Sequence, residues 1–122
     1  MSLLLAVASS LGYSGSAITL SAVWDNLSVT SPDTDSSNVV TLTFTGGGSR
    51  DIRLDYTILG SVSYKKNGGT TTEYSGPISV VTTDTLQFIY THTIPGEPES
   101  RPVRVYDDTR GGLIDTFTVT AS

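Results

Sequence analysis

The sequence of 122 residues contains no cysteine, one histidine, one methionine, three glutamates and two lysines. Without cysteine, disulfide bonds and thiolate metal sites are excluded. Residues that favour helices are scarce, whereas 17 serines and 19 threonines are present, and these suit strands and turns. The length fits one domain that is large enough to bury a hydrophobic core of its own.

Positive charge is also in short supply. The formal net charge is -5 and the isoelectric point is about 4.5. Nucleic acids and anionic membranes both need a basic surface, and Lys65 and Lys66 at a predicted hairpin tip are too few to make one. We therefore expect neither nucleic acid nor a membrane as a partner.

The dominant pattern is an alternation of apolar and polar side chains. In residues 51–64 an apolar side chain recurs at every second position, which predicts a long strand with one face on a core and a kink at Gly60. Residues 67–69 (NGG) tolerate positive φ and predict a tight hairpin to a return strand at residues 70–74. Similar patterns predict strands at residues 17–24, 40–44, 78–81, 86–90, 103–105 and 113–121. Eight or nine short strands without a substantial helix indicate an all-β antiparallel sandwich.

The alternation also predicts which side chains form the core and which segments are loops. Ile89 falls on the outward face of its strand, and residues 31–38 and 91–102 are expected to be mobile loops because of their proline, serine and aspartate content. His92 lies in the second loop and is expected to be solvated. The predicted core consists of Trp24, Val40, Leu42, Phe44, Leu54, Tyr56, Leu86, Phe88, Val105, Phe117 and Val119.

Nothing in the sequence spells out catalysis. The single histidine has no nucleophile motif beside it, so we expect a protein that is not an enzyme and needs no cofactor. The carboxylate pairs stand in predicted turns, where aspartate is common for backbone reasons. A calcium site built from Asp107, Asp108 and Asp115 is the alternative interpretation of these acids.

The N-terminal residues 1–16 differ from the predicted sandwich of residues 17–122. An apolar run at residues 3–8 is followed by a glycine- and serine-rich spacer at residues 11–16. The run resembles a fragment of a signal peptide but lacks a basic start. Two interpretations stay open: an edge strand of its own domain, or an arm that adds to a sheet of a neighbouring subunit. The arm would make its contacts through Leu3, Leu4, Leu5 and Val7.

The C-terminal half contains a series of short motifs that mark strands and turns. They are a Y-x-x-N-G tip at residues 64–68, G-x-I-x-V at 76–80 and D-T-L-x-F at 84–88, followed by V-x-V-x-D at 103–107 and D-T-F-T-V at 115–119. With these motifs, residues 18–122 resemble small immunoglobulin-like modules in structural proteins of tailed bacteriophages. The resemblance implies an immunoglobulin-like order of strands and a role as a binding or cementing part of a virion.

Two functions follow as expectations. The first is a virion structural protein, most simply a small capsid decoration or cement protein that binds other virion proteins such as the major capsid protein, with self-association as a further option. The alternative is a tail or fibre module that binds host-surface carbohydrate. That alternative needs exposed aromatic side chains, for which the candidates are Tyr13, Tyr74 and Tyr106.

Overall fold

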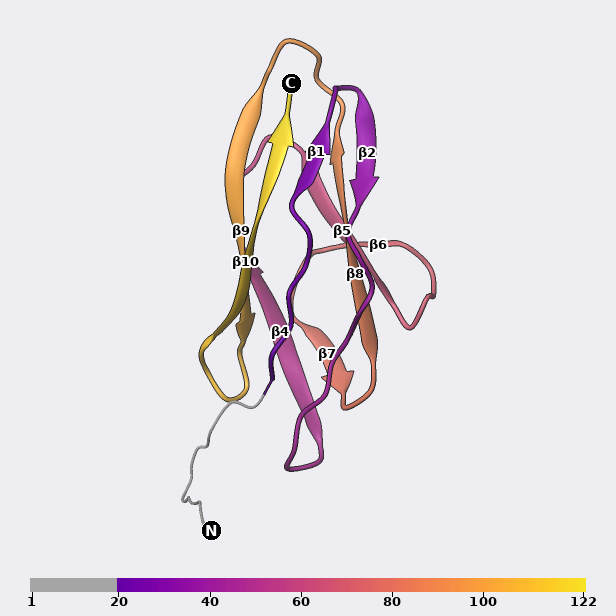
Figure 1. Ribbon diagram of the computed structural model, residues 1–122, viewed down its shortest axis with the longest axis vertical. Helices are drawn as coiled ribbons and strands as arrows, with labels where there is room; N and C mark the ends of the chain where they lie inside the picture. The colour runs from indigo at the N-terminus through magenta and orange to yellow at the C-terminus, as the bar shows by residue number, and fades with distance from the viewer. Residues whose placement is uncertain (1–19) are drawn as a thin grey trace.

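The computed structural model describes residues 20–122, which form ten strands in two facing sheets and contain no helix (Figure 1). The first sheet has the order β1 (Leu27–Val29), β10 (Leu113–Ala121), β9 (Glu99–Asp107), β4 (Ser49–Asp55) and β7 (Ile78–Val81). The second has the order β2 (Asp33–Ser36), β8 (Thr85–His92), β5 (Ser61–Lys66) and β6 (Thr72–Glu73), and β3 (Val40–Thr41) also pairs with β8. The predicted all-β sandwich is confirmed, with ten described strands where eight or nine were expected. Of the described pairs, β1 with β10 is parallel and the others are antiparallel.

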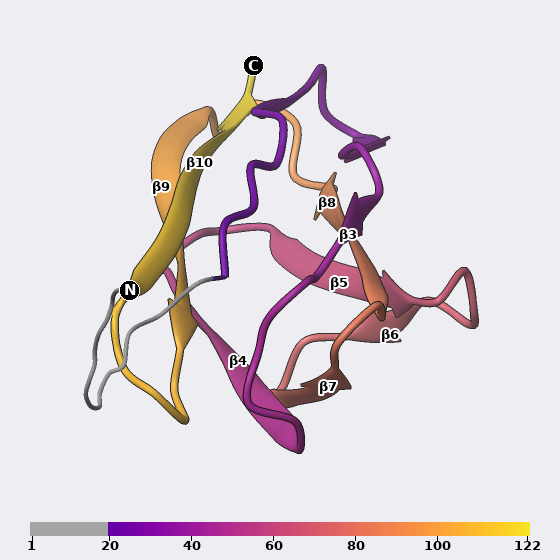
Figure 2. The same ribbon diagram turned by 60° about the horizontal axis from the view of Figure 1, so that its bottom comes forward.

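Aromatic side chains pack against one another between the two sheets. Figure 2 shows the backbone of the two sheets with the bottom of the molecule turned forward. The ring centroids of Trp24 and Phe88 are 4.9 Å apart, and those of Phe88 and Phe117 are 5.5 Å apart. The indole nitrogen of Trp24 donates to the carbonyl oxygen of Leu86 at 3.1 Å, so the polar atom of this buried ring is satisfied. Of the predicted core, Val40 and Tyr56 are only partly buried, and the other nine side chains are buried.

The long strand predicted over residues 51–64 is two strands that belong to different sheets. β4 ends at Asp55, residues 56–60 cross between the sheets, and β5 begins at Ser61. The alternation continues through the crossover, so the sequence alone does not reveal the change of sheet. Gly60 is required at this point because a Cβ there would collide with the backbone oxygen of Thr91.

The predicted hairpin after β5 is confirmed. Asn67 and Gly68 have φ values of 55° and 67°, in the left-handed region that such a turn needs. The side chain of Asn67 also binds the neighbouring loop, because its Nδ2 donates to Asp84 Oδ1 at 2.9 Å and its Oδ1 accepts from Thr85 N at 2.8 Å.

Three further predicted elements differ from the structure. Residues 20–26 are not in a sheet, although Leu20, Ala22 and Trp24 are buried alternately as predicted. The expected loop at residues 31–38 contains β2, and the predicted strand at residues 40–44 is paired only over Val40–Thr41. Polar side chains kept β2 from being predicted as a strand, since its sequence (DTDS) has no apolar residue.

The proline-rich loop predicted at residues 91–102 is much shorter than expected. β8 continues to His92 and β9 begins at Glu99, so only residues 93–98 connect them. Ile89 is also buried rather than exposed, with 8% of its surface accessible. The prediction for Leu3, Leu4, Leu5 and Val7 lies outside the described residues, as does the boundary between residues 16 and 17.

Candidate functional site

A shallow groove opens where β4 separates from β9. β4 pairs with β9 as far as Asp55, which lies opposite Arg104, whereas β9 extends further to Glu99 against β10. The crossover of residues 56–60 and the start of β9 therefore form two walls. Two adjoining hollows of about 340 Å³ each lie between them, one lined by residues 57–59 and 98–101 and the other by residues 55–57, 101, 102 and 104. We call this site the β9 groove.

Glu99 fixes one wall of the groove. Its carboxylate accepts hydrogen bonds from the backbone nitrogens of Leu59 at 2.8 Å and Gly60 at 3.1 Å, and from Tyr90 Oη at 2.5 Å. Only 3% of the side chain is accessible. Burial, the largest influence, raises the pKa of Glu99, but the three hydrogen bonds and the nearby His92 outweigh it and lower the pKa below the usual glutamate value. The carboxylate is thus held ionised as an anchor for the crossover.

His92 extends this buried network toward Ser31 and, through it, Ser122. Its Nδ1 lies 2.8 Å from Ser31 Oγ, and Ser31 Oγ also lies 3.2 Å from the carbonyl oxygen of His92. Its Nε2 has no hydrogen-bond partner and lies 3.9 Å from Glu99 Oε2. The expectation of a solvated histidine is wrong, because 1% of the side chain is accessible and β8 extends as far as this residue.

The order Ser31, His92, Glu99 has the composition of a catalytic triad without its geometry. A nucleophile needs open space for an acyl group beside the hydroxyl. Neither hollow of the β9 groove is lined by Ser31 or His92, and Ser31 Oγ is engaged with both the ring and the backbone of His92. The backbone nitrogen of Ser31 donates to the carbonyl of the C-terminal Ser122. The network therefore acts as a tie between chain segments.

Arg101 and Arg104 give the groove its charge. Both side chains are exposed, and among residues 20–122 no carboxylate oxygen lies within 4.0 Å of either guanidinium. Arg50 and Arg53, by contrast, have acidic partners at 3.1 Å and 2.9 Å. Asp55 lies opposite Arg104 in the strand register but beyond ion-pair distance. The groove thus has two exposed cationic groups and two carboxylates, of which Asp55 is exposed and Glu99 is buried.

Tyr56 provides an aromatic surface in the same groove. The ring is partly buried, and its centroid lies 6.0 Å from that of Tyr74. Burial, followed by the proximity of Tyr74 and Glu73, raises the pKa of Tyr56, so the phenol remains neutral. Sequence reasoning had assigned Tyr56 to the core and therefore missed it as a groove residue.

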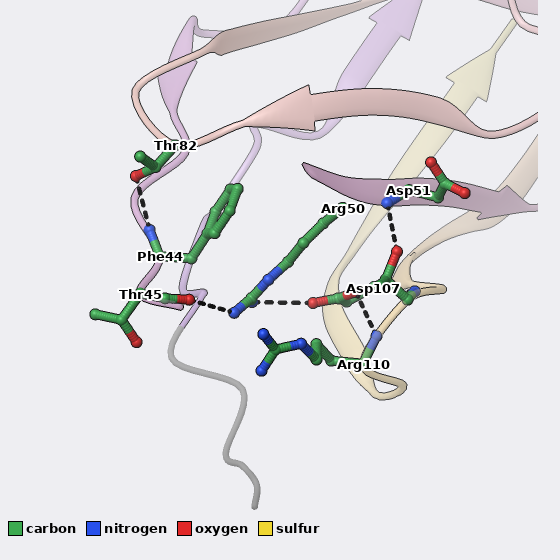
Figure 3. A network of polar contacts seen from close by, with 8 residues as sticks. Phe44, Thr45, Arg50, Asp51, Thr82, Asp107 and Arg110 are labelled. Carbon is green, nitrogen blue, oxygen red and sulfur yellow. Dashed lines mark hydrogen bonds and ion pairs between the residues drawn. The ribbon is translucent and has the colours of Figure 1, made fainter. Parts of the chain in front are cut away.

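A second buried polar cluster lies at the other end of β9 (Figure 3). Arg50 Nη1 donates to Asp107 Oδ2 at 3.1 Å, and both side chains are almost fully buried. Arg50 Nη2 donates to the carbonyl of Thr45, and the guanidinium lies 4.4 Å from the ring centroid of Phe44. Asp107 Oδ1 accepts from the backbone nitrogens of the following turn, at residues 109 and 110. The cluster ties two loops to the core.

The three acids considered for calcium have separate roles. Asp107 pairs with Arg50, Asp108 pairs with Arg53, and Asp115 accepts a hydrogen bond from Trp24 N at 2.8 Å. Within residues 20–122 no group of three or more aspartate, glutamate, histidine or cysteine residues is placed to hold a metal ion. The structure does not bring these three carboxylates together as a ligand set.

The remaining candidates are dispersed. Tyr74 accepts a hydrogen bond from Leu54 N at its phenol oxygen, and Tyr106 packs beneath Arg53 with 4.6 Å between the guanidinium carbon and the ring centroid. Tyr13 lies outside the described residues. Lys66 Nζ donates to the carbonyl of Ser79. Residues 20–122 contain no helix, and therefore none that is long and apolar enough to cross a membrane.

Comparisons with known proteins identify a fold and no family. No protein-family model matches the sequence, and no curated protein matches it. The N-terminal domain of PorA is structurally similar, with a TM-score of 0.52 and 8% identity over 86% of this chain and 90% of that one. A non-cellulosomal cohesin from the hyperthermophilic archaeon Archaeoglobus fulgidus has a TM-score of 0.44 and 11% identity over 86% of this chain and 92% of that one. At such identities the first likeness supports the all-β fold and says nothing of a role.

Proposed function

We propose that the chain is a non-enzymatic structural protein of a tailed-bacteriophage virion, most simply a small capsid decoration or cement protein. It would be held in the particle by contacts with other virion proteins such as the major capsid protein. The observation that carries the proposal is where the phage-like motifs fall. The Y-x-x-N-G motif at residues 64–68 ends β5 and forms its hairpin turn, and the motifs at residues 103–107 and 115–119 lie in β9 and β10.

The use of the buried charged groups supports a binding role without catalysis. Arg50 and Asp107 connect loops to the core, and Glu99 and His92 belong to the polar network at the opposite end of β9. Each of these groups is enclosed, so none is free to meet a substrate. Catalytic groups in enzymes are instead found beside a space that a substrate can enter.

The apolar residues of the N-terminal segment are the proposed attachment device. In this proposal Leu3, Leu4, Leu5 and Val7 add to a sheet of a neighbouring subunit, with backbone hydrogen bonds providing affinity and leucine burial offsetting the entropy of ordering. The test uses purified particles of the phage that carries the gene. Deleting residues 1–10 is expected to leave a folded protein that no longer binds the particle.

One control variant and two contrary results complete this test. Replacing residues 11–16 with a glycine and serine spacer of equal length should preserve binding, since the proposed contacts are made by residues 3–7. If the deletion unfolds the domain, the segment is an edge strand of its own domain. If mass spectrometry finds no copy of the chain in the purified particles, the virion proposal is wrong.

A second candidate is a tail or fibre module that binds host-surface carbohydrate. The observation that favours it is the β9 groove, which combines a partly buried tyrosine with exposed charged groups. A glycan array probed with the whole protein tests it, and absence of binding to every glycan would contradict it.

A further inference from the structure

We propose that the β9 groove binds a saccharide that carries a carboxylate, as uronic acids do. The inference deepens the second candidate function and rests on it, since it names the chemical class of sugar. Its starting point is the pair Arg101 and Arg104, which line one hollow together on either side of Pro102.

The two guanidinium groups lack partners in a protein with an excess of acids. The chain contains 12 acidic and 7 basic residues, and yet no carboxylate within residues 20–122 approaches Arg101 or Arg104 to 4.0 Å. Arginine binds a carboxylate through two parallel hydrogen bonds, which gives geometric selectivity as well as strength. A ligand carboxylate would therefore find paired donors here that the fold itself leaves unused.

Asp55 favours a sugar acid over a simple anion as the ligand of this groove. Its carboxylate is exposed and lies on the same hollow, opposite Arg104 in the strand register. A multiply charged anion such as phosphate would be repelled by it. A sugar instead offers hydroxyl groups that Asp55 accepts from, and Thr57 adds a hydroxyl that both donates and accepts.

Tyr56 and the rigidity of the wall complete the recognition surface. Tyr56 lines the same hollow and is half-buried against the core, so the accessible part of its ring is available to the C–H face of a sugar. The crossover that carries this tyrosine is held by the bonds from Leu59 N and Gly60 N to Glu99. Because the wall is fixed beforehand, binding does not have to order it.

The shape of the groove suits more than one sugar ring. The two hollows of about 340 Å³ share Thr57 and Arg101, so they form one continuous surface. Small-molecule sites have volumes from roughly 300 Å³ upward, so each hollow has room for one ring. The geometry points to a short oligosaccharide with its carboxylate on the arginine side.

The test is a titration of the full-length, isotope-labelled protein with trigalacturonic acid, followed by amide NMR shifts. The neutral galactose trimer of the same linkage and sodium acetate serve as comparison ligands. Saturable shifts are expected at Thr57, Arg101 and Arg104 with the acidic trimer. The double change Arg101→Gln and Arg104→Gln should weaken its binding about tenfold or more, the loss expected for charge-assisted hydrogen bonds.

Arg110→Gln is the matched control, because it removes an exposed charge at the opposite end of β9. Unchanged affinity in this variant supports the groove as the site. An equal loss in the control would mean non-specific charge attraction and would overturn the proposal. If the neutral trimer binds as tightly as the acidic trimer, the carboxylate inference is overturned and carbohydrate binding stands. If acetate binds as tightly as the acidic trimer, the groove recognises a carboxylate without a sugar, and the proposal is overturned. No shift with either trimer would overturn the inference, whereas the second candidate function is contradicted only if the glycan array is also negative.

Discussion

Two ion pairs that connect β4 to the end of β9 and the turn after it allow a direct comparison of a buried and an exposed charge. Arg50 with Asp107 is enclosed, with 1% and 0% of the side chains accessible, whereas Arg53 with Asp108 has 41% and 43% accessible. The changes Asp107→Asn and Asp108→Asn remove the same charge from adjacent positions and preserve side-chain shape. Any difference in their effect therefore comes from the environment.

The expected loss of stability differs several-fold between the two variants. Asp107→Asn leaves the Arg50 guanidinium buried without its counter-charge, which costs about 3–5 kcal/mol. The contacts of Arg50 with Thr45 and Phe44 do not neutralise it, and its Nε already has no hydrogen-bond partner. Asp108→Asn breaks a solvated pair and costs about 0–1 kcal/mol. Against a total stability of about 5–15 kcal/mol, the first loss is a large fraction.

Urea denaturation followed by tryptophan fluorescence measures both variants, because Trp24 is buried in the core. Equal m-values in the two variants would show that the midpoints can be compared directly. A third variant, Arg50→Met with Asp107→Leu, removes both charges and should recover most of the stability. If Asp107→Asn and Asp108→Asn lose the same small amount, the burial argument is wrong. The reasoning also fails if the apolar double variant is as unstable as Asp107→Asn.

Three further predictions concern pH, packing and metal ions. The pKa of Glu99 is lower in the folded protein than in the unfolded chain. The stability that its carboxylate contributes is therefore present above the unfolded pKa and is lost as the pH falls through the folded pKa. The difference in unfolding free energy between wild type and Glu99→Gln should shrink on acidification below about pH 4.3, and a constant difference would contradict this. Gly60→Ala should lower the free energy of unfolding by about 1–3 kcal/mol, because the new Cβ collides with the backbone oxygen of Thr91. Gly76→Ala is the control, since a Cβ there meets nothing within 4 Å, and thermal melting measures both variants. Calcium should leave the melting temperature unchanged, and a rise abolished by Asp115→Asn would restore the calcium interpretation of Asp107, Asp108 and Asp115.

Local patterns were enough to predict the class of fold and most of the core. Alternation in residues 86–90 and 113–121 places Leu86, Phe88, Phe117 and Val119 inward, and all four are buried. The turn at Asn67 and Gly68 was also predictable, because few residues other than glycine and asparagine adopt positive φ. These features depend on neighbours two to four positions apart, which the sequence displays directly.

The candidate site could not be predicted in the same way. Arg101, Arg104 and Tyr56 are brought together by the pairing of β4 with β9, whose paired residues lie 49 to 55 positions apart in the chain, and no motif connects them. His92 and Glu99 flank a segment of polar residues and proline, which indicates a loop and conceals their burial. The signal for a strand was absent at β2 for the same reason, since its four residues are all polar.

The all-β sandwich follows from the order of residues, because side-chain alternation and turn residues act over a few positions. Which charged side chains are enclosed and which remain available depends instead on how the strands and loops pack in three dimensions. Arg50 and Arg53 lie three residues apart, yet one is buried against Asp107 and the other is half exposed beside Asp108. Whether a charged side chain is buried depends on which residues of the opposite sheet and of the loops cover it, and those residues come from distant parts of the chain. The same holds for the β9 groove, which exists because the chain leaves the sheet after Asp55 and crosses at Gly60.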